Sequence, residues 1–427
     1  MSFTIRNKFT YDEIFDLLSF IGLLLLVLFD TRTFFIDYLP ISVITSIILF
    51  LLLLIFLFQC SIIYYQKRAL KFKNRTFDIL IGTFLILYGL RMIDNIFIDR
   101  IYQTNFVNRY TFLVYYFFLM LLPVIMVRNI RFNYLNISRF FNILIFIFLI
   151  SLIIVYIGVT KQVETHNVDP SGRFSANIML DSIGYGHLGL TFLLLCVSQI
   201  KLNKVPRHKW LFLLLIPWGI FSMAIANARS PFVALMFILF IYILIRINYK
   251  ILLLILVVGV LFVLNIDNLN NFFLSNFDSS FIERFISIFE GGENFITASG
   301  RDDYYRQGLS IFLEHPLFGN SILITEGPLR GGYVHNFFIE SLMALGITGG
   351  LLFLLITLLC FWCTFSLIKR DSNYMFFALL FLQYFVYSMF SRTLLALPLY
   401  WVSCACVFSV YLIDIRNDKT QISSIEK

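Results

Sequence analysis

The sequence predicts an all-α protein that crosses a membrane many times. Of its 427 residues, 59% are hydrophobic and only 14% are charged, against roughly 25% charged in an ordinary soluble domain. A chain with so few charges lacks the polar surface that keeps a protein in water. The composition therefore excludes a soluble enzyme, a disulfide-rich secreted domain and a disordered protein. The net charge of +8 shows no sign of nucleic-acid binding. In a membrane protein, the side of the bilayer on which the positive charges lie indicates the topology.

Twelve stretches are long and apolar enough to be membrane-spanning helices, since a bilayer requires about 20 such residues. They lie roughly at residues 14–35, 40–65, 77–97, 110–127, 140–160, 178–200, 210–227, 231–247, 251–267, 335–368, 374–391 and 394–413. Asp30 and Arg32 interrupt the first span, and the sixth is the least apolar because it contains Asp181 and His187. We expect residues 1–427 to form a single membrane domain.

The positive charges orient these spans. With the N-terminus in the cytoplasm, 21 of the 33 Lys and Arg residues fall in cytoplasmic segments and 11 in external segments, while Arg91 lies within the third span. The positive-inside rule then predicts that both termini are cytoplasmic. Ten of the eleven external cations are arginine, whose planar fork suits carboxylate or phosphate oxygens. We expect part of this set to bind a ligand, although interfacial anchoring explains any single member.

One external connection is long, at residues 267–333 between the ninth and tenth spans, and such loops usually carry function. Two capping boxes predict short amphipathic helices in it. Ser280-Phe-Ile-Glu283 precedes the apolar segment 285–289, and Ser299-Gly-Arg-Asp302 opens a helix that should end before Pro316. Both helices are expected to lie on the membrane surface over the bundle. A lid without chemistry is the alternative.

Two external residues have the chemistry of a site. Arg229 lies in a tight turn between the seventh and eighth spans, where an arginine should face water or a partner. His335 lies at the mouth of the tenth span, where an imidazole can exchange protons. Interfacial snorkelling of Arg229 and a structural role for His335 are the alternatives.

Four short motifs follow one another on the external side. They are Ala228-Arg229-Ser230, Ser299-Gly-Arg301, His315-Pro-Leu-Phe-Gly319, and His335-Asn336 followed after nine residues by Gly346-Ile-Thr-Gly349. In this order they resemble the O-antigen polymerase and ligase superfamily, over roughly residues 210–360 by motif and over the whole chain by span number and the late long loop. The resemblance implies a fold like that of the C-type membrane glycosyltransferases (GT-C), in the bacterial inner membrane, with the active site facing the periplasm.

The same resemblance implies the reaction and its residues. A glycan on undecaprenyl diphosphate is the donor, with no cofactor and no metal. Arg229 and Arg301 would bind the diphosphate, and His335 would be the general base, so direct attack predicts inversion. Arg306, Arg330, His315 and Asn336 are further candidates for substrate contacts, although His315 equally suits a loop-packing role. No external Asp/Glu cluster has metal spacing, and Asp302-Asp303 is interpreted as helix capping, so arginine forks would hold the leaving group.

Several functions remain open at this level. A polymerase joins lipid-linked repeat units, and the Phe-, Ile-, Asn- and Tyr-rich composition resembles that of the divergent O-antigen polymerases. A ligase transfers the glycan to lipid A-core. A flippase for the same lipid-linked unit should show broken helices, internal repeats and midplane charges, whereas only Arg91 and Asp181 are charges near the midplane and no repeat is visible. A non-catalytic scaffold is the last alternative. Membrane lipids and a chain-length regulator protein are the expected partners.

Overall fold

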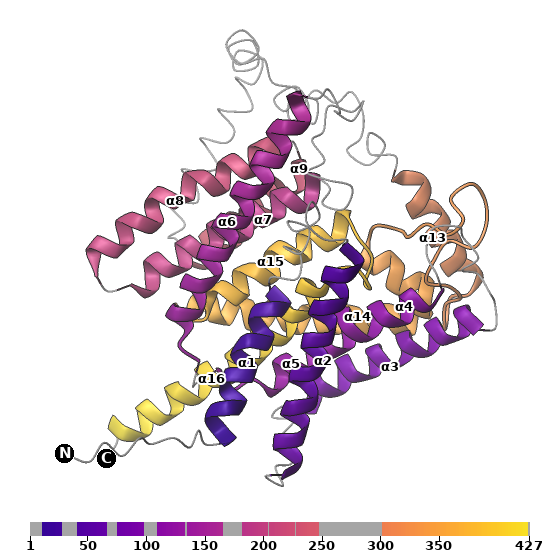
Figure 1. The fold of residues 1–427 in the computed structure, drawn as a ribbon. Helices are drawn as coiled ribbons and strands as arrows, with labels where there is room; N and C mark the ends of the chain where they lie inside the picture. The colour runs from indigo at the N-terminus through magenta and orange to yellow at the C-terminus, as the bar shows by residue number, and fades with distance from the viewer. Residues whose placement is uncertain are drawn as a thin grey trace.

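The protein is a helical bundle (Figure 1). The computed structural model describes residues 11–27, 41–65, 75–97, 109–132, 135–164, 182–203, 205–226, 228–246 and 301–425. Over these residues there are helices and no strand, and eight helices are long and apolar enough to cross a membrane. The prediction of an all-α polytopic membrane protein is thus confirmed.

The helices follow the predicted spans closely. They are α1 (Tyr11–Val27), α2 (Ile41–Tyr65), α3 (Arg75–Phe97), α4 (Arg109–Tyr115), the π-helix η2 (Tyr116–Leu121), α5 (Leu122–Asn129), α6 (Ile137–Glu164), α7 (Ser182–Leu202), α8 (Pro206–Ile225), α9 (Arg229–Arg246), α13 (Asp302–Glu314), α14 (Phe337–Lys369), α15 (Met375–Phe390) and α16 (Pro398–Ile425). Helices α4, η2 and α5 together make the fourth predicted span. The ninth span, 251–267, lies outside the described residues.

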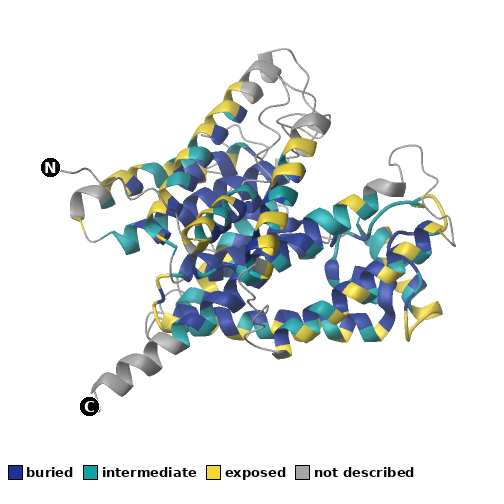
Figure 2. Ribbon diagram, turned by 60° about the horizontal axis from the view of Figure 1, so that its bottom comes forward, coloured by how far each residue is buried: buried dark blue, intermediate teal, exposed yellow. Residues whose placement is uncertain are grey.

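Helix α15 occupies the centre of the bundle. Most of its side chains are buried, and it packs against α7, α9, α14 and α16. A helix that is apolar on all sides is buried either inside a protein or in lipid, and the packing of α15 places it inside the protein. Figure 2 shows the buried residues gathered in the middle of the bundle and exposed residues on the outward sides of the peripheral helices. The ends of α15 are therefore the points where several helices meet.

Helices α7, α8 and α9 alternate in direction, as the predicted topology requires. At one end, Ser230 of α9 lies beside His187 near the start of α7. At the other end, Lys201 of α7 and Arg246 of α9 both form ion pairs with Asp371. Burial opposes the ionisation of Asp371, but these two cations outweigh it and hold the pKa of the carboxyl below its ordinary value. Two cations predicted to be cytoplasmic thus meet at one end of the bundle.

Helix α13 is the described helix of the long loop. It ends at Glu314, before Pro316, as predicted. The predicted capping box is wrong, however, because the N-cap residue is Arg301 and its side chain makes no capping bond. Asp302 and Asp303 occupy the first turn instead, where negative charge stabilises the exposed N–H groups. The other predicted loop helix, at residues 285–289, lies outside the described residues.

A small second core joins α13 to the beginning of α14. Ile311, Ile324, Val334 and Met343 are buried against one another, with partly buried Tyr304 packed on them. Helix α13 therefore rests on protein along one face, which fixes its position relative to the first turns of α14.

Candidate functional site

Helix α14 is broken at Gly346, and another loop fills the break. Gly346 has φ +64° and Gly319 has φ +64°, a conformation that costs glycine little. The two backbones touch: a Cβ on Gly346 would lie 2.4 Å from the carbonyl carbon of Leu317, and one on Gly319 would lie 2.4 Å from that of Ala344. Residues 316–321 thus lie directly against the break, an arrangement we call the interlock.

The interlock satisfies backbone groups that the break leaves without helical partners. Asn320 N–H donates to the carbonyl of Met343 at 2.9 Å, and Ile347 N–H donates to the carbonyl of Pro316 at 2.8 Å. In hydrocarbon an unsatisfied backbone group costs several kcal/mol, so irregular backbone at that depth needs such protein partners.

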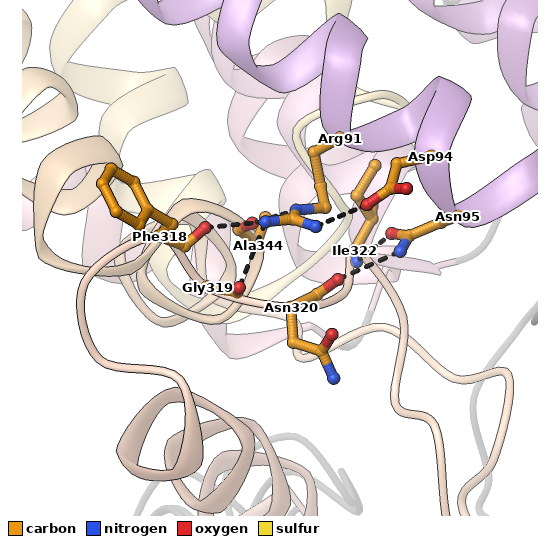
Figure 3. Close-up of polar contacts among 8 residues, drawn as sticks. All are labelled: Arg91, Asp94, Asn95, Phe318, Gly319, Asn320, Ile322 and Ala344. Atoms are coloured by element: carbon orange, nitrogen blue, oxygen red, sulfur yellow. Dashed lines mark hydrogen bonds and ion pairs between the residues drawn. The ribbon is translucent and has the colours of Figure 1, made fainter. Parts of the chain in front are cut away.

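Arg91 of α3 holds both sides of the interlock (Figure 3). Its Nε donates to the carbonyl of Ala344 at 3.0 Å, and its Nη2 donates to those of Phe318 at 2.9 Å and Gly319 at 3.1 Å. Its Nη1 pairs with Asp94 at 2.7 Å. The charge predicted inside the third span thus binds the backbone of two distant segments.

Asn95, next to this pair, adds two further bonds. Its side-chain amide donates to the carbonyl of Asn320 at 3.0 Å and accepts from the N–H of Ile322 at 3.1 Å (Figure 3). Helix α14 is thus a broken helix of the kind that transporters use around a substrate, but here protein fills the break.

A second set of contacts converges on the C-terminal end of α15. Asn336 is the N-cap of α14 and accepts hydrogen bonds from the N–H groups of Phe338 and Ile339. Its side-chain amide also donates to the carbonyl of Met389 at 3.1 Å. The residue after His335 therefore ties the mouth of α14 to the last turn of α15.

Helix α13 reaches the same carbonyl. The hydroxyl of Tyr305 donates to Met389 O at 3.4 Å, and Tyr305 lies one turn after Arg301. Burial raises the pKa of the Tyr305 hydroxyl, and the charge of Arg301 opposes that rise, so this charge lies within electrostatic range of Tyr305.

The Arg229 end of α9 joins this region through two aromatic rings. Ser230 Oγ lies 3.0 Å from Nε2 of the buried His187, and the His187 ring stacks on that of Tyr387 with centroids 4.0 Å apart. Nε of Arg392 donates to the Tyr387 hydroxyl at 3.1 Å. Arg229 and Arg392 are therefore linked through one short chain of contacts at the end of α15.

His335 itself lies between two tyrosines. Its backbone has φ +59°, unusual for a residue other than glycine, and its ring is 5.4 Å from that of Tyr304 and 4.3 Å from that of Tyr333. The ring is thereby held between the start of α13 and the start of α14. Strained backbone of this kind is concentrated at functional sites.

Buried Glu340 fixes the loop that carries Arg392. Its carboxylate accepts from the Tyr88 hydroxyl at 2.6 Å, the Thr393 hydroxyl at 2.7 Å and the N–H of Leu394 at 3.1 Å. Arg392 directly precedes these last two residues and has φ +70°. A carboxylate with three donors thus anchors a strained arginine beside the aromatic pair.

The sequence-predicted site residues fall into two groups. Arg229, Arg301, His335 and Asn336 lie on, or next to, residues that contact one another around the end of α15. The other three do not: Arg306 is 75% exposed and pairs with Asp302, Arg330 is exposed in a turn, and His315 is exposed at the far end of α13. At 1.5 Å per helical residue, His315 is about 20 Å from Arg301.

Sequence reasoning missed Arg392, Glu340 and His187. Arg392 belonged to the arginine-rich external set, but no motif distinguished it. Glu340 and His187 are polar residues within apolar helices, which is itself a signal of function. Only the folded chain shows that all three lie at the end of α15.

The geometry described above can be compared with known protein families. A family model described as O-Antigen ligase matches residues 210–354. This region begins in α8 and contains Arg229, Arg301, His335 and both sides of the interlock. No curated protein matches the chain.

Proposed function

The chain belongs to the O-antigen polymerase and ligase superfamily, and from this premise we propose that it is an O-antigen polymerase. It would join undecaprenyl-diphosphate-linked oligosaccharide repeat units at the periplasmic face of the bacterial inner membrane, with both termini in the cytoplasm. The observation that carries the proposal is the convergence of the Arg229, Arg301 and His335 segments on the end of α15.

The arginines would bind the donor diphosphate. Negative charge on the leaving group grows as the anomeric C–O bond breaks, and fixed cations stabilise that charge. Arg229 and Arg301 present planar forks suited to phosphate oxygens. Arg392 is the third arginine of the region, and its Nε bond to Tyr387 orients its fork.

His335 would act as the base. Its imidazole takes the proton of the acceptor hydroxyl while the hydroxyl oxygen forms a bond to the anomeric carbon. The bond between that carbon and the diphosphate oxygen breaks, and undecaprenyl diphosphate leaves with the electron pair. Attack from the face opposite the leaving group inverts the anomeric configuration. This scheme requires no metal.

A ligase is the second candidate, because the family match does not distinguish it from a polymerase. It would transfer the glycan from the same donor to lipid A-core. The lipopolysaccharide ladder of a deletion strain separates the two functions. Core carrying a single repeat identifies a polymerase, and core without any repeat, with lipid-linked polymer accumulating, identifies a ligase. A normal ladder contradicts both, and movement of lipid-linked glycan across liposomes without joining would identify a flippase.

The residue roles have their own test. Arg229→Ala, Arg301→Ala and His335→Ala should each reduce glycan transfer by at least about a hundredfold, while the purified variants keep a melting temperature close to that of the wild type. Arg370→Ala, at the opposite end of α14, is the matched control. Near-normal polymer in all three variants would refute the proposed site.

A further inference from the structure

A polar groove lies between α13 and the loop that follows it, outside the arginine and histidine site. Its volume is about 270 Å³, close to the ~300 Å³ at which small-molecule pockets begin. The polar side chains that line it are Gln307, Ser310, Glu314, Thr325 and Glu326. The first three are spaced three and four residues apart, so they share one face of α13.

A glycine in the loop keeps the groove open. Gly327 lines the groove and has φ +74°. A Cβ at that position would lie 3.3 Å from Nε2 of Gln307, so any side chain there would approach this amide. The loop therefore passes close to α13 without filling the space beside it.

The groove combines an apolar floor with polar walls. Ile311 and Ile324 line it and are buried. Oε1 of Gln307 is buried and accepts no hydrogen bond from the described residues, although buried polar atoms in proteins nearly always have a partner. Carboxylates, hydroxyls and an amide above an apolar floor match the hydroxyl groups and C–H faces of a sugar.

The groove begins about one helical turn along α13 from the tyrosine that contacts the proposed base. Tyr304 contacts the His335 ring, Gln307 lies about one helical turn further along α13, and Glu314 about two turns beyond that. Arg301 lies at the opposite end of the same helix. Helix α13 thus begins at the arginine proposed to bind the donor diphosphate and has the acidic groove toward its other end, so the two substrates would bind at separate places along one helix.

We propose that this groove binds the sugar of the acceptor, with its reactive hydroxyl directed toward His335, and that it selects neutral or amino sugars over acidic ones. The selection follows from Glu314 and Glu326, because carboxylates accept hydrogen bonds from hydroxyl and ammonium groups and repel a uronic acid. The inference rests on the proposed function, since it assigns the groove to the same reaction.

Binding of a free oligosaccharide tests the groove without any transfer reaction. The probe is the oligosaccharide released by mild acid from the lipid-linked glycan of the strain that carries this chain, titrated into the full-length protein in nanodiscs. Wild type, Arg301→Ala and the control Leu309→Ala should bind it equally, because the probe has no diphosphate and Leu309 does not line the groove. Gln307→Ala and Glu314→Gln should each weaken binding about fivefold, the loss expected for one hydrogen bond. Unchanged binding by the Gln307→Ala/Glu314→Gln double variant, or no binding by wild type, overturns the inference.

Neutralising the two carboxylates of the groove distinguishes a loss of sugar selectivity from a general loss of structure. Wild type should prefer a neutral trisaccharide over its counterpart with one uronic acid, and Glu314→Gln/Glu326→Gln should lose that preference. An unchanged preference contradicts the groove assignment. If the wild type binds the oligosaccharide with these effects but forms no polymer or ligated product, the proposed function fails and the groove remains a glycan site. If the Gln307→Ala/Glu314→Gln variant transfers glycan with the same KM for the acceptor as the wild type, only the groove assignment fails.

Discussion

The interlock and the end of α15 both include residues of the sequence motifs, but different chemical groups make the contacts in the two regions. The interlock joins backbone to backbone through Gly319 and Gly346, and the Arg91 side chain is bound to carbonyls and to Asp94. At the end of α15 the side chains of Asn336, Tyr305 and Arg392 make the contacts. The interlock thus joins backbone segments, whereas side chains make the contacts in the region that we propose to be the site.

This difference separates two kinds of arginine. Arg91 donates four hydrogen bonds within the protein, to three carbonyls and one carboxylate. Arg392 donates through its Nε to the Tyr387 hydroxyl, a contact with a side chain in place of the backbone carbonyls that Arg91 binds. We therefore expect substitutions in the interlock to reduce folding and substitutions at the end of α15 to reduce activity. The predictions below test that division.

The largest effect is expected for Gly346→Ala. The new Cβ would lie 2.4 Å from the carbonyl carbon and 2.6 Å from the carbonyl oxygen of Leu317, and backbone has little freedom to move aside. We expect a loss of about 4 kcal/mol or more, seen as aggregation on size-exclusion chromatography in detergent. Gly82→Ala in α3 is the control, because its Cβ would meet no atom within 4 Å. A well-folded Gly346→Ala protein would contradict the interlock.

Arg91→Met should have the next largest effect on stability. It retains much of the apolar stem but removes the bonds to Ala344, Phe318 and Gly319. Leaving these carbonyls and Asp94 without their cation should cost about 3 kcal/mol, measured as a lower melting temperature in nanodiscs. Arg306→Gln, at a 75% exposed position, should change stability by less than about 0.5 kcal/mol. Equal melting temperatures for Arg91→Met and wild type would show that the hydrogen bonds of Arg91 contribute nothing to stability.

The same division explains what the sequence predicts. The positions of the apolar helices follow from hydropathy, and the end of α13 before Pro316 follows from local chemistry. The interlock depends on contacts between residues some 225 positions apart, such as Asn95 with Asn320, which no local pattern encodes. Ser299 was predicted as a cap because the motif suits one, but two acidic residues already favour a helix that begins at Asp302.

Site residues divide in the same way. Arg229, Arg301 and His335 belong to recognisable motifs, whereas Arg392 and Glu340 depend on a tertiary contact between the 391–397 loop and α14. His315 belongs to a motif and Arg330 lies near one in sequence, but His315 is exposed at the C-terminal end of α13 and Arg330 is exposed in the turn that follows.

Arg392→Lys tests the functional side of the comparison. Lysine keeps the charge but lacks the Nε donor and the planar fork. We expect the rate of polymer formation to fall about 10- to 100-fold, with a melting temperature within a degree or two of wild type. Arg370→Lys at the other end of α14 should have no effect on the rate. Full activity with Arg392→Lys would remove Arg392 from the site, and a large loss of stability would place it with the structural arginines.

The smallest effect is expected for Asp371→Asn. Asp371 lies far from both regions, so this variant shows the effect of losing an ion pair elsewhere in the protein. Lys201 and Arg246 hold the folded-state pKa of Asp371 below its ordinary value, so its contribution to stability is present above the unfolded pKa of about 4 and is lost as the pH falls through the folded pKa. Because the side chain is 53% exposed, the contribution should stay below about 1 kcal/mol. The difference in melting temperature between wild type and Asp371→Asn should therefore be small and constant between pH 5 and 8 and should disappear below about pH 4, with polymer formation unchanged.

A difference that grew toward acid pH would mean that Asp371 is protonated in the folded protein. A loss of activity would mean that this end of the bundle also determines function, and the division between the two regions would then be too simple.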